Sequence, residues 1–201
     1  EVKVLLCGET LNGCELKNVK NENDKDPCWN CRFNSNNIVK FYRLNTINLS
    51  DVISELEIQE IIKEIKEIEL NDGDFFKYDI NITRGVKDSI VRYFYGNVPE
   101  DKKKYNHLLY EHYFSAILSL KAVRKIDIDW RPDVVFNNMA VYNWYPIYKY
   151  FNNNGDRFKT LNFTQYDFHK IVFNLFDILR SSKRFQDYLN SRREKNLSAS
   201  E

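Results

Sequence analysis

Glycine and proline are scarce in this 201-residue chain, which contains six glycines and four prolines. An all-β protein needs more of both, because it must turn the chain between many short strands. Long apolar runs are also missing, and no stretch reaches the roughly 18 to 20 residues that a membrane-spanning helix requires. These absences argue against an all-β fold and predict a protein that is soluble or bound only at a membrane surface.

Net charge is nearly absent. Lysine and arginine together number 30 against 29 acidic residues, which leaves a formal charge of +1. Such a balance creates no whole-molecule field that would attract nucleic acid or an anionic membrane. We therefore expect no nucleic-acid partner, and any anionic ligand needs a local site. The 43% hydrophobic content is ample for a packed core, and the length suits one domain.

The sequence also lacks several catalytic motifs, namely a phosphate-binding glycine loop, a GxSxG elbow and an HExxH pair. Two of its three histidines, His107 and His112, are five positions apart on a predicted helix. That spacing separates them by roughly 140° around the helix axis, so they do not form a paired metal site. His169 follows on a later helix beside Lys170, where a surface position is expected.

Cysteine is rare too, and its four copies are confined to the first 31 residues, at Cys7, Cys14, Cys28 and Cys31. Four thiolates are the number that a closed tetrahedral zinc site needs, and the CxxC pair supplies two of them from one turn. We therefore interpret the cluster as a structural zinc site. Disulfides remain an alternative, although no hydrophobic signal segment precedes the first strand. Four reduced thiols are the second alternative, since Cys7 ends an apolar run typical of a buried strand.

The order of the predicted elements indicates the α/β class, with a Rossmann-like parallel sheet flanked by helices in a helix-rich single domain. The domain spans 1–194, contains a Cys-rich loop over 7–37, and is followed by a frayed tail over 195–201. The apolar run over 2–8 predicts a buried central strand. Further strands are expected around 134–136 and at 157–163. Residues 75–80 are expected to form a strand or an extended lead into the next helix, and 38–42 a short strand or helical turn. Helices are expected over 50–70, 85–95, 102–125, 145–151, 166–181 and 184–193.

Two of these helices carry specific expectations. Ser50 is expected to cap the first, whose apolar face repeats at Val52, Leu56, Ile58, Ile61, Ile62, Ile65 and Ile68. The second, over 85–95, is expected to have four side chains that face the core, Val86, Ile90, Val91 and Phe94. Its start is flanked by Arg84, Lys87 and Arg92, and helix N-terminal amides there could help these cations to hold a phosphate or carboxylate. A solvated charged face explains the same three residues equally well.

Candidate ligand-binding residues follow two predicted strands. In an open parallel sheet, ligands bind outside the carboxyl ends of the strands. Gly8 and Glu9 follow the first strand, and a second group follows the strand near Val135: Asn137, Asn138, Tyr142, Asn143 and Trp144. Asparagine amides both donate and accept hydrogen bonds, as sugar hydroxyls require, and aromatic faces can stack on a pyranose ring. Glu9 is the best-placed catalytic carboxylate and Glu111 a remote second. Loop caps and core aromatics are the alternative interpretation.

Several short motifs resemble one protein family. They are the strand ending in Cys7-Gly8, the CxxC at Cys28 to Cys31, the Gly85-x-x-x-Ser89-x-x-Arg92-Tyr93 helix start, and the segment Arg131-Pro132-Asp133-Val134-Val135-Phe136-Asn137-Asn138. A later Tyr188-Leu189-x-x-Arg192-Arg193 continues the pattern. Together they resemble the N-terminal half of bacterial surface or capsular polysaccharide glycosyltransferases, over about residues 3 to 193. Where the family has Asn-Gly after the strand, this chain has Asn137-Asn138.

The resemblance implies a GT-B-like enzyme with two Rossmann-like domains, of which the first mainly binds the acceptor and the second the nucleotide-sugar donor. This chain would then be the acceptor-side domain, with a carbohydrate acceptor as partner, working in the cytoplasm or at the inner face of the membrane through peripheral contact. We expect these 201 residues alone not to turn over a sugar nucleotide. A hypothesis of another class is a non-catalytic α/β interaction module whose N-terminal loop is stapled by zinc.

Overall fold

The computed structural model describes residues 1–14, 17, 26–70, 73–94, 96, 98–137, 144–155 and 159–162. The chain divides into two compact units, Glu1–Leu161 and Asn162–Glu201, and all described residues except Asn162 belong to the first. The helices predicted over 166–181 and 184–193 and the tail over 195–201 lie outside the described residues. The described elements are β1 (Lys3–Leu6), α2 (Pro27–Tyr42), β2 (Asn45–Asn48), α3 (Leu49–Val52), α4 (Glu55–Leu70), β3 (Phe76–Lys77), β4 (Ile80–Asn81), α5 (Ile82–Tyr93), α6 (Lys102–Trp130), β5 (Val134–Asn137), α7 (Tyr145–Asn153) and β6 (Lys159–Asn162).

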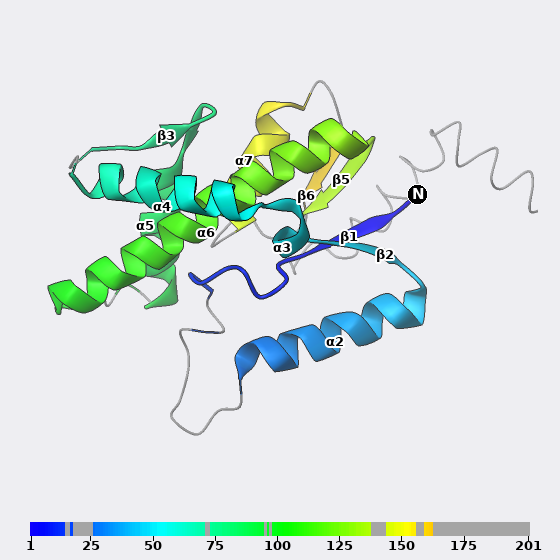
Figure 1. Cartoon of the computed structure of the whole chain (residues 1–201), viewed down its shortest axis with the longest axis horizontal. Helices are drawn as coiled ribbons and strands as arrows, with labels where there is room; N and C mark the ends of the chain where they lie inside the picture. Colours follow the sequence, from blue (N-terminus) through cyan, green and yellow to red (C-terminus); the bar gives the residue numbers. More distant parts are fainter. Residues whose placement is uncertain are drawn as a thin grey trace, which may run out of the picture. The chain divides into compact units, whose positions relative to one another are not determined.

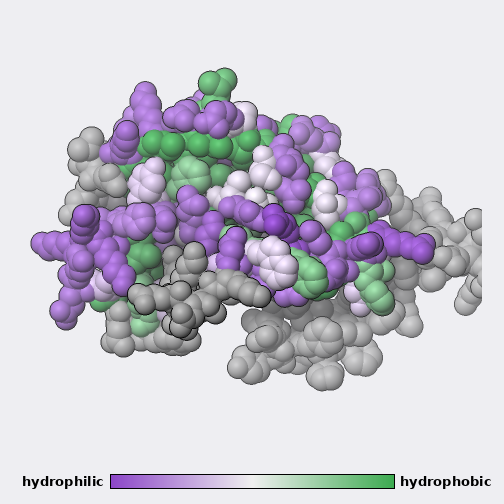
Figure 2. All heavy atoms as spheres, turned by 60° about the horizontal axis from the view of Figure 1, so that its bottom comes forward, coloured by the Kyte–Doolittle hydropathy of each residue, from purple (hydrophilic) through white to green (hydrophobic). Residues whose placement is uncertain are grey.

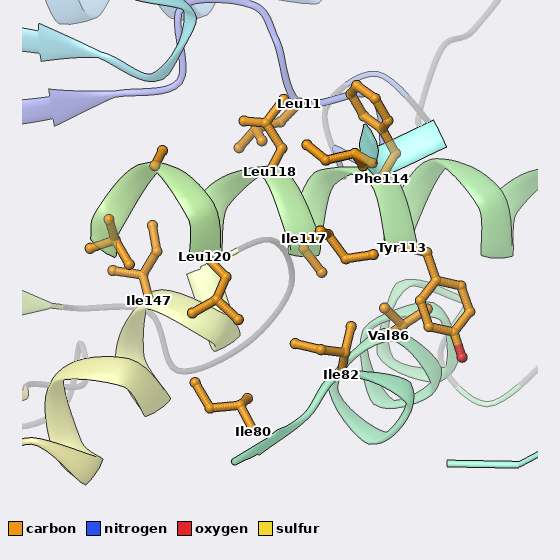
Figure 3. Close-up of a cluster of buried hydrophobic side chains, with 14 of the residues drawn as sticks. Leu11, Ile80, Ile82, Val86, Tyr113, Phe114, Ile117, Leu118, Leu120 and Ile147 are labelled. Carbon is orange, nitrogen blue, oxygen red and sulfur yellow. The ribbon is translucent and has the colours of Figure 1, made fainter. Parts of the chain in front are cut away.

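The core is built around α6, the long helix predicted over 102–125, which is confirmed and continues to Trp130. It packs against α3, α4, α5 and α7, and Figure 1 shows it running between them. Its apolar residues do not form a single stripe, because neighbours contact it on several sides. In Figure 3, Leu11 lies on one side of α6, while Ile82, Val86 and Ile147 lie on the other. A helix surrounded in this way is apolar around most of its circumference.

The parallel sheet is small. β1 pairs with β2 in parallel, from Lys3 opposite Asn45 to Leu6 opposite Asn48. The described strands form three two-stranded sheets, β1–β2, β3–β4 and β5–β6. The structure therefore confirms a helix-rich chain with a parallel strand pair, compatible with the α/β class. The expectation that β1 is a buried central strand is wrong within this part of the chain, because β1 is only half-buried and β2 is its one described partner.

The loop predicted over 7–37 is wrong in its second half, because α2 begins at Pro27. Asp26 caps this helix, and its carboxylate accepts a hydrogen bond from the Cys28 backbone N–H at 3.0 Å. Proline at the first helical position lacks only an N–H that would have no partner within the helix. Aspartate followed by proline is thus a helix-start signal. It was obscured by the polar, asparagine-rich composition of the segment.

The single helix predicted over 50–70 is also wrong, because the chain forms two helices. α3 ends at Val52, and α4 starts at Glu55 after a cap at Ser54. The Ser54 backbone N–H donates to the Glu57 carboxylate at 2.8 Å, and the Glu57 N–H donates back to Ser54 Oγ at 3.4 Å. This reciprocal pair is a capping box. In α4 the expected core positions Ile61, Ile65 and Ile68 are buried, whereas Leu56 is 77% exposed.

The chain between α4 and α5 folds into a hairpin, since β3 and β4 pair antiparallel. Tyr78 and Asp79 make the turn, both with positive φ, at 53° and 62°. Asn81 then caps α5, and its side-chain oxygen accepts from the Arg84 N–H at 2.8 Å. The helix predicted over 85–95 is therefore confirmed with an earlier start. Val86 and Ile90 are buried as expected, but the inward assignment of Val91 is wrong, because this residue is 46% exposed.

The C-terminal part of the described chain follows the predicted order. The strand expected around 134–136 is β5, the helix expected over 145–151 is α7, and the strand expected over 157–163 is β6. A buried hydrogen bond ties α7 to α6, in which the Tyr150 hydroxyl donates to Asp127 Oδ2 at 2.6 Å. This bond satisfies part of the hydrogen-bonding capacity of the buried Asp127 carboxylate. A buried carboxylate without hydrogen-bond donors would destabilise the fold.

Candidate functional site: the cysteine pocket

A pocket of about 470 Å³ lies at the carboxyl end of β1. We call it the cysteine pocket, because all four cysteines of the chain line it. The residues around it are Leu5, Leu6, Cys7, Gly8, Glu9, Leu11, Cys14, Lys17, Pro27, Cys28, Cys31, Arg32, Ser35, Asn36, Asn48, Ser50 and Trp144. They come from the end of β1, the segment from there to Lys17, the N-terminal part of α2, the end of β2, the start of α3 and the N-cap of α7.

Parallel pairing explains why residues from β1 and β2 meet at this edge. Both strands end on the same side, so the turn after Leu6 lies against Asn48 and Ser50. Gly8 and Glu9 make that turn with φ values of 61° and 66°. A side chain at Gly8 would overlap the Ser50 hydroxyl, so glycine is required there by both space and backbone conformation. The predicted position of a ligand site at the end of the first strand therefore coincides with a real pocket.

The α2 side of the pocket presents two thiols and one guanidinium. Cys28 and Cys31 are three residues apart, which places them on one face of the helix. Arg32 reaches to the opposite wall, where its Nη1 lies 2.7 Å from a Glu9 carboxylate oxygen. The Lys17 ammonium donates to the Glu9 backbone carbonyl at 3.2 Å. Two cations thus lie at the pocket beside the four thiols.

Two of the thiols, those of Cys7 and Cys28, have raised pKa values. Burial raises the pKa of Cys7, and the nearby Cys31 and Cys28 raise it further, whereas backbone N–H groups of Glu9 and Leu11 act in the opposite direction. Burial likewise raises the pKa of Cys28, while Lys17 lowers it. Reactive cysteines have lowered pKa values, so Cys7 and Cys28 do not resemble activated nucleophiles. None of the four is part of a disulfide.

The structure brings together most of the residues predicted for a site. Seven of them line the cysteine pocket: Cys7, Gly8, Glu9, Cys14, Cys28, Cys31 and Trp144. Asn137 is the last residue of β5, and its side chain lies outside the described part of the structure, as do Asn138, Tyr142 and Asn143. The sequence did not identify Lys17, Arg32, Asn48 or Ser50 as site residues. Asn48 was missed because the strand before it, Asn-Thr-Ile-Asn, is too polar to be recognised as a strand.

Arg84, also predicted as a binding residue, does not line the cysteine pocket. It lies with Arg92, Lys149, Asp88 and Tyr145 around a separate hollow of about 170 Å³ between α5 and α7. The side chains of Arg84 and Asp88 are 74% and 64% exposed and approach each other to 3.9 Å. The amide of Arg84 is already bonded to Asn81. The interpretation as a solvated charged face fits this geometry better than an anion site at the helix start.

The histidines do not add a metal site. His107 is 70% exposed and contacts Glu111, whereas His112 is buried. Burial lowers the pKa of His112 to about 4, so this imidazole is neutral near pH 7. Across the described ranges, no three His, Cys, Asp or Glu side chains lie close enough together to hold a metal ion as they stand. His169 lies outside the described residues.

Comparison of the chain with protein-family models, with curated proteins and with solved structures yields no match. None of the described helices combines the length and apolar character needed to cross a membrane. On the face drawn in Figure 2, hydrophilic residues cover most of the described surface, with smaller hydrophobic patches between them.

Proposed function

We propose that the chain is the acceptor-side domain of a glycosyltransferase of surface polysaccharide synthesis and that the cysteine pocket binds the carbohydrate acceptor. The observation that carries this proposal is the convergence of Gly8, Glu9 and Trp144 on one pocket at the carboxyl end of a parallel strand pair. The residues come from both ends of the first unit's sequence. The motif resemblance supports the same function, and with it a Rossmann-like arrangement of the sheet in the whole domain.

The polar wall of the pocket suits sugar hydroxyls. The side-chain N–H of Asn48 donates to Asp51 at 2.8 Å, and the Ser50 hydroxyl donates to the same carboxylate at 3.2 Å. Asp51 therefore orients both groups, and it leaves the Asn48 oxygen and the Ser50 lone pairs as acceptors. Trp144 offers an apolar face to the less polar side of a sugar ring. Aromatic faces combined with fixed polar groups are typical of sites that orient a small ligand.

Glu9 is the group that would take part in transfer. Its carboxylate, held by Arg32, accepts the proton of the acceptor hydroxyl while the hydroxyl oxygen forms a bond to the anomeric carbon of the donor. The bond from that carbon to the phosphate oxygen breaks, and a nucleoside diphosphate leaves. Donor binding is assigned to a second domain that the resemblance implies. We place this reaction in the cytoplasm or, through peripheral contact, at the inner face of the membrane.

Saccharide binding to the purified chain tests the proposal. Saturation-transfer NMR with a panel of mono- and disaccharides is expected to show transfer to at least one of them. Trp144→Ala is expected to weaken that binding about tenfold, equivalent to about 1.4 kcal/mol. Trp29→Ala is the matched control, because Trp29 is 48% exposed on α2 and does not line the pocket. Equal loss of binding in both variants, or no transfer to any sugar, would contradict an acceptor site in this pocket.

The second candidate is a non-catalytic α/β interaction module. The outward face of α2 supports it, since Trp29 and Phe33 stack with ring centroids 5.3 Å apart and are 48% and 52% exposed. Exposed aromatic pairs are frequent at protein interfaces. The same saccharide experiment separates the two functions, because a protein-interaction module is not expected to bind sugars in a way that depends on Trp144. Binding lost selectively in Trp144→Ala favours the acceptor-side domain.

A further inference from the structure

We propose that the chain binds one zinc ion through the thiolates of Cys7, Cys14, Cys28 and Cys31, and that this ion fastens α2 to the end of β1. The inference does not depend on sugar binding, since it rests on a different set of side chains in the cysteine pocket. It assigns the metal a structural role, with four sulfur ligands and no open coordination position.

Convergence of the thiols is the first observation. The four cysteines come from three separate segments, the end of β1, the turn over 11–14 and the first turns of α2, yet all line the same pocket. They are also the only cysteines in the sequence. Cysteines that serve only as small core residues would be scattered through the core. A metal site, in contrast, requires its cysteines to lie together.

The backbone around Cys7 is the second observation. Gly8 and Glu9 both adopt positive φ, and the N–H groups of Glu9 and Leu11 donate to the Cys7 sulfur. Such amide-to-sulfur hydrogen bonds belong to the outer shell that orients metal ligands and tunes their charge.

Charge balance is the third observation. Four thiolates around Zn²⁺ carry a net charge of −2, and Lys17 and Arg32 lie at the same pocket. Lys17 can offset part of that charge through its position beside the Glu9 carbonyl. The Glu9 carboxylate is engaged by Arg32 at 2.7 Å, which leaves it poorly placed to compete as a ligand. No histidine lines the described pocket, so the site has an all-sulfur donor set.

The fourth observation is the exposure of α2 in the described structure. None of its 16 residues is buried, and Figure 1 shows the helix apart from those packed around α6. An isolated helix of this length is marginal in water. Hydrophobic packing therefore does not fix α2, although its two thiols face the pocket. A metal that joins Cys28 and Cys31 to Cys7 and Cys14 supplies the missing attachment.

Binding requires a defined local change. Zinc holds each sulfur at about 2.3 Å. Among the described residues no three such ligands are gathered closely enough to hold a metal as they stand, so the thiols must come together when the ion binds. Each of the four S–H bonds breaks, a Zn–S bond forms in its place, and the four protons pass to water. The pocket narrows at its sulfur end, while Trp144, Asn48 and Ser50 stay on other elements.

Metal analysis of the purified chain tests the inference. We expect about one zinc per chain, and four thiols that react with a disulfide reagent only after chelation. Substitution with Co²⁺ is expected to give intense sulfur-to-metal charge-transfer bands and the visible bands of a tetrahedral ion. Cys7→Ser and Cys31→Ser are expected to lose zinc, while Ser35→Ala, which alters another pocket residue of α2, is expected to retain it.

The Co²⁺ spectrum of the unmodified chain keeps the inference testable even where a serine variant fails to fold. A protein without zinc that gives no charge-transfer band with Co²⁺ would overturn the proposal. So would a Cys28–Cys31 disulfide in protein purified under reducing conditions, or four thiols that react at the same rate with and without added zinc. Retention of zinc by Cys31→Ser at the unmodified level would equally contradict a four-sulfur site.

Discussion

His112 is a buried ionisable side chain in the middle of α6, and the backbone of Gly13 packs directly against it. A Cβ at Gly13 would lie 2.7 Å from the His112 Cα. Burial disfavours the imidazolium and lowers its pKa to about 4. In the unfolded chain a histidine has a pKa of about 6.5. Protonation therefore favours unfolding between these two values.

This difference predicts a pH dependence of stability. The contribution of neutral His112 is complete above about pH 6.5 and is lost as the pH falls toward 4, by up to about 3 kcal/mol. Urea unfolding between pH 8 and pH 4 measures it, and His112→Gln is expected to flatten the slope. His107→Gln, at a histidine that is 70% exposed, is expected to leave the slope unchanged. A titration of His112 by NMR with a midpoint near 6.5 would contradict this explanation.

Gly85, near the start of α5, packs closely against α7, and this contact explains why the position holds a glycine. A Cβ there would overlap the ring of Tyr145 from α7. Gly85→Ala is expected to destabilise the protein by about 1 to 3 kcal/mol, because the cost of overpacking exceeds the helix propensity of alanine. Gly73→Ala, where no atom lies within 4 Å of the new Cβ, is the control and is expected to change stability little. Thermal unfolding compares the two, and equal shifts in Tm would show that the close contact has no role.

At the scale of elements, the helix caps decide where the chain turns. Ser54 and Glu57 form the capping box of α4, and Lys125 of α6 donates to the same Glu57 carboxylate at 2.9 Å. Bonds from Ser54 and Lys125 lower the pKa of Glu57 to about 2. This carboxylate therefore contributes stability above its unfolded pKa, near 4.3, and the contribution is lost as the pH falls toward 2. The pH range of this loss lies below the pH range in which the His112 contribution is lost.

A pair of serine variants tests the position of the cap. Ser54→Ala is expected to cost about 1 kcal/mol, because it removes a side-chain partner of the first-turn amides. Ser50→Ala is expected to cost less than about 0.5 kcal/mol, since Ser50 lies inside α3 and is not its N-cap. Urea denaturation at neutral pH measures both free energies of unfolding. The reverse order would place the cap at Ser50, as the sequence pattern suggested.

The same elements show what sequence patterns can and cannot predict. The helices α5, α6 and α7 and the strands β5 and β6 were predictable because apolar spacing and breakers such as Pro132 determine them locally. The strand β2 was not, since Asn-Thr-Ile-Asn is stabilised by pairing with β1 and by its neighbours rather than by its own propensity. α2 was obscured by its polar composition. Its start signal, Asp26-Pro27, is local and readable.

At the scale of the whole molecule, residues far apart in the sequence meet at the cysteine pocket. The position after β1 was predictable from the rule that ligands bind at the carboxyl ends of parallel strands, and Gly8, Glu9 and Trp144 do lie there. The pairing of Glu9 with Arg32 was not, because it depends on how α2 folds back over the turn. The place of Arg84 at a separate hollow was not predictable either, because a local charge pattern cannot tell which hollow a side chain lines.

Removal of the proposed zinc ion is expected to affect one part of the first unit selectively. Because none of the α2 residues is buried, chelation is expected to increase amide hydrogen exchange across Pro27–Tyr42. The amides of α6, which forms the core, are expected to keep their protection. Exchange followed by mass spectrometry compares the two helices in one sample. Unchanged exchange in α2 after complete removal of the metal would show that zinc does not fasten it.

X-ray absorption at the zinc edge tests most directly the central claim that the four cysteines form one site. The purified chain is expected to show a single shell of four sulfur atoms at about 2.3 Å. A shell that contains nitrogen or oxygen ligands, or fewer than four sulfurs, would contradict the claim that Cys7, Cys14, Cys28 and Cys31 together hold the ion.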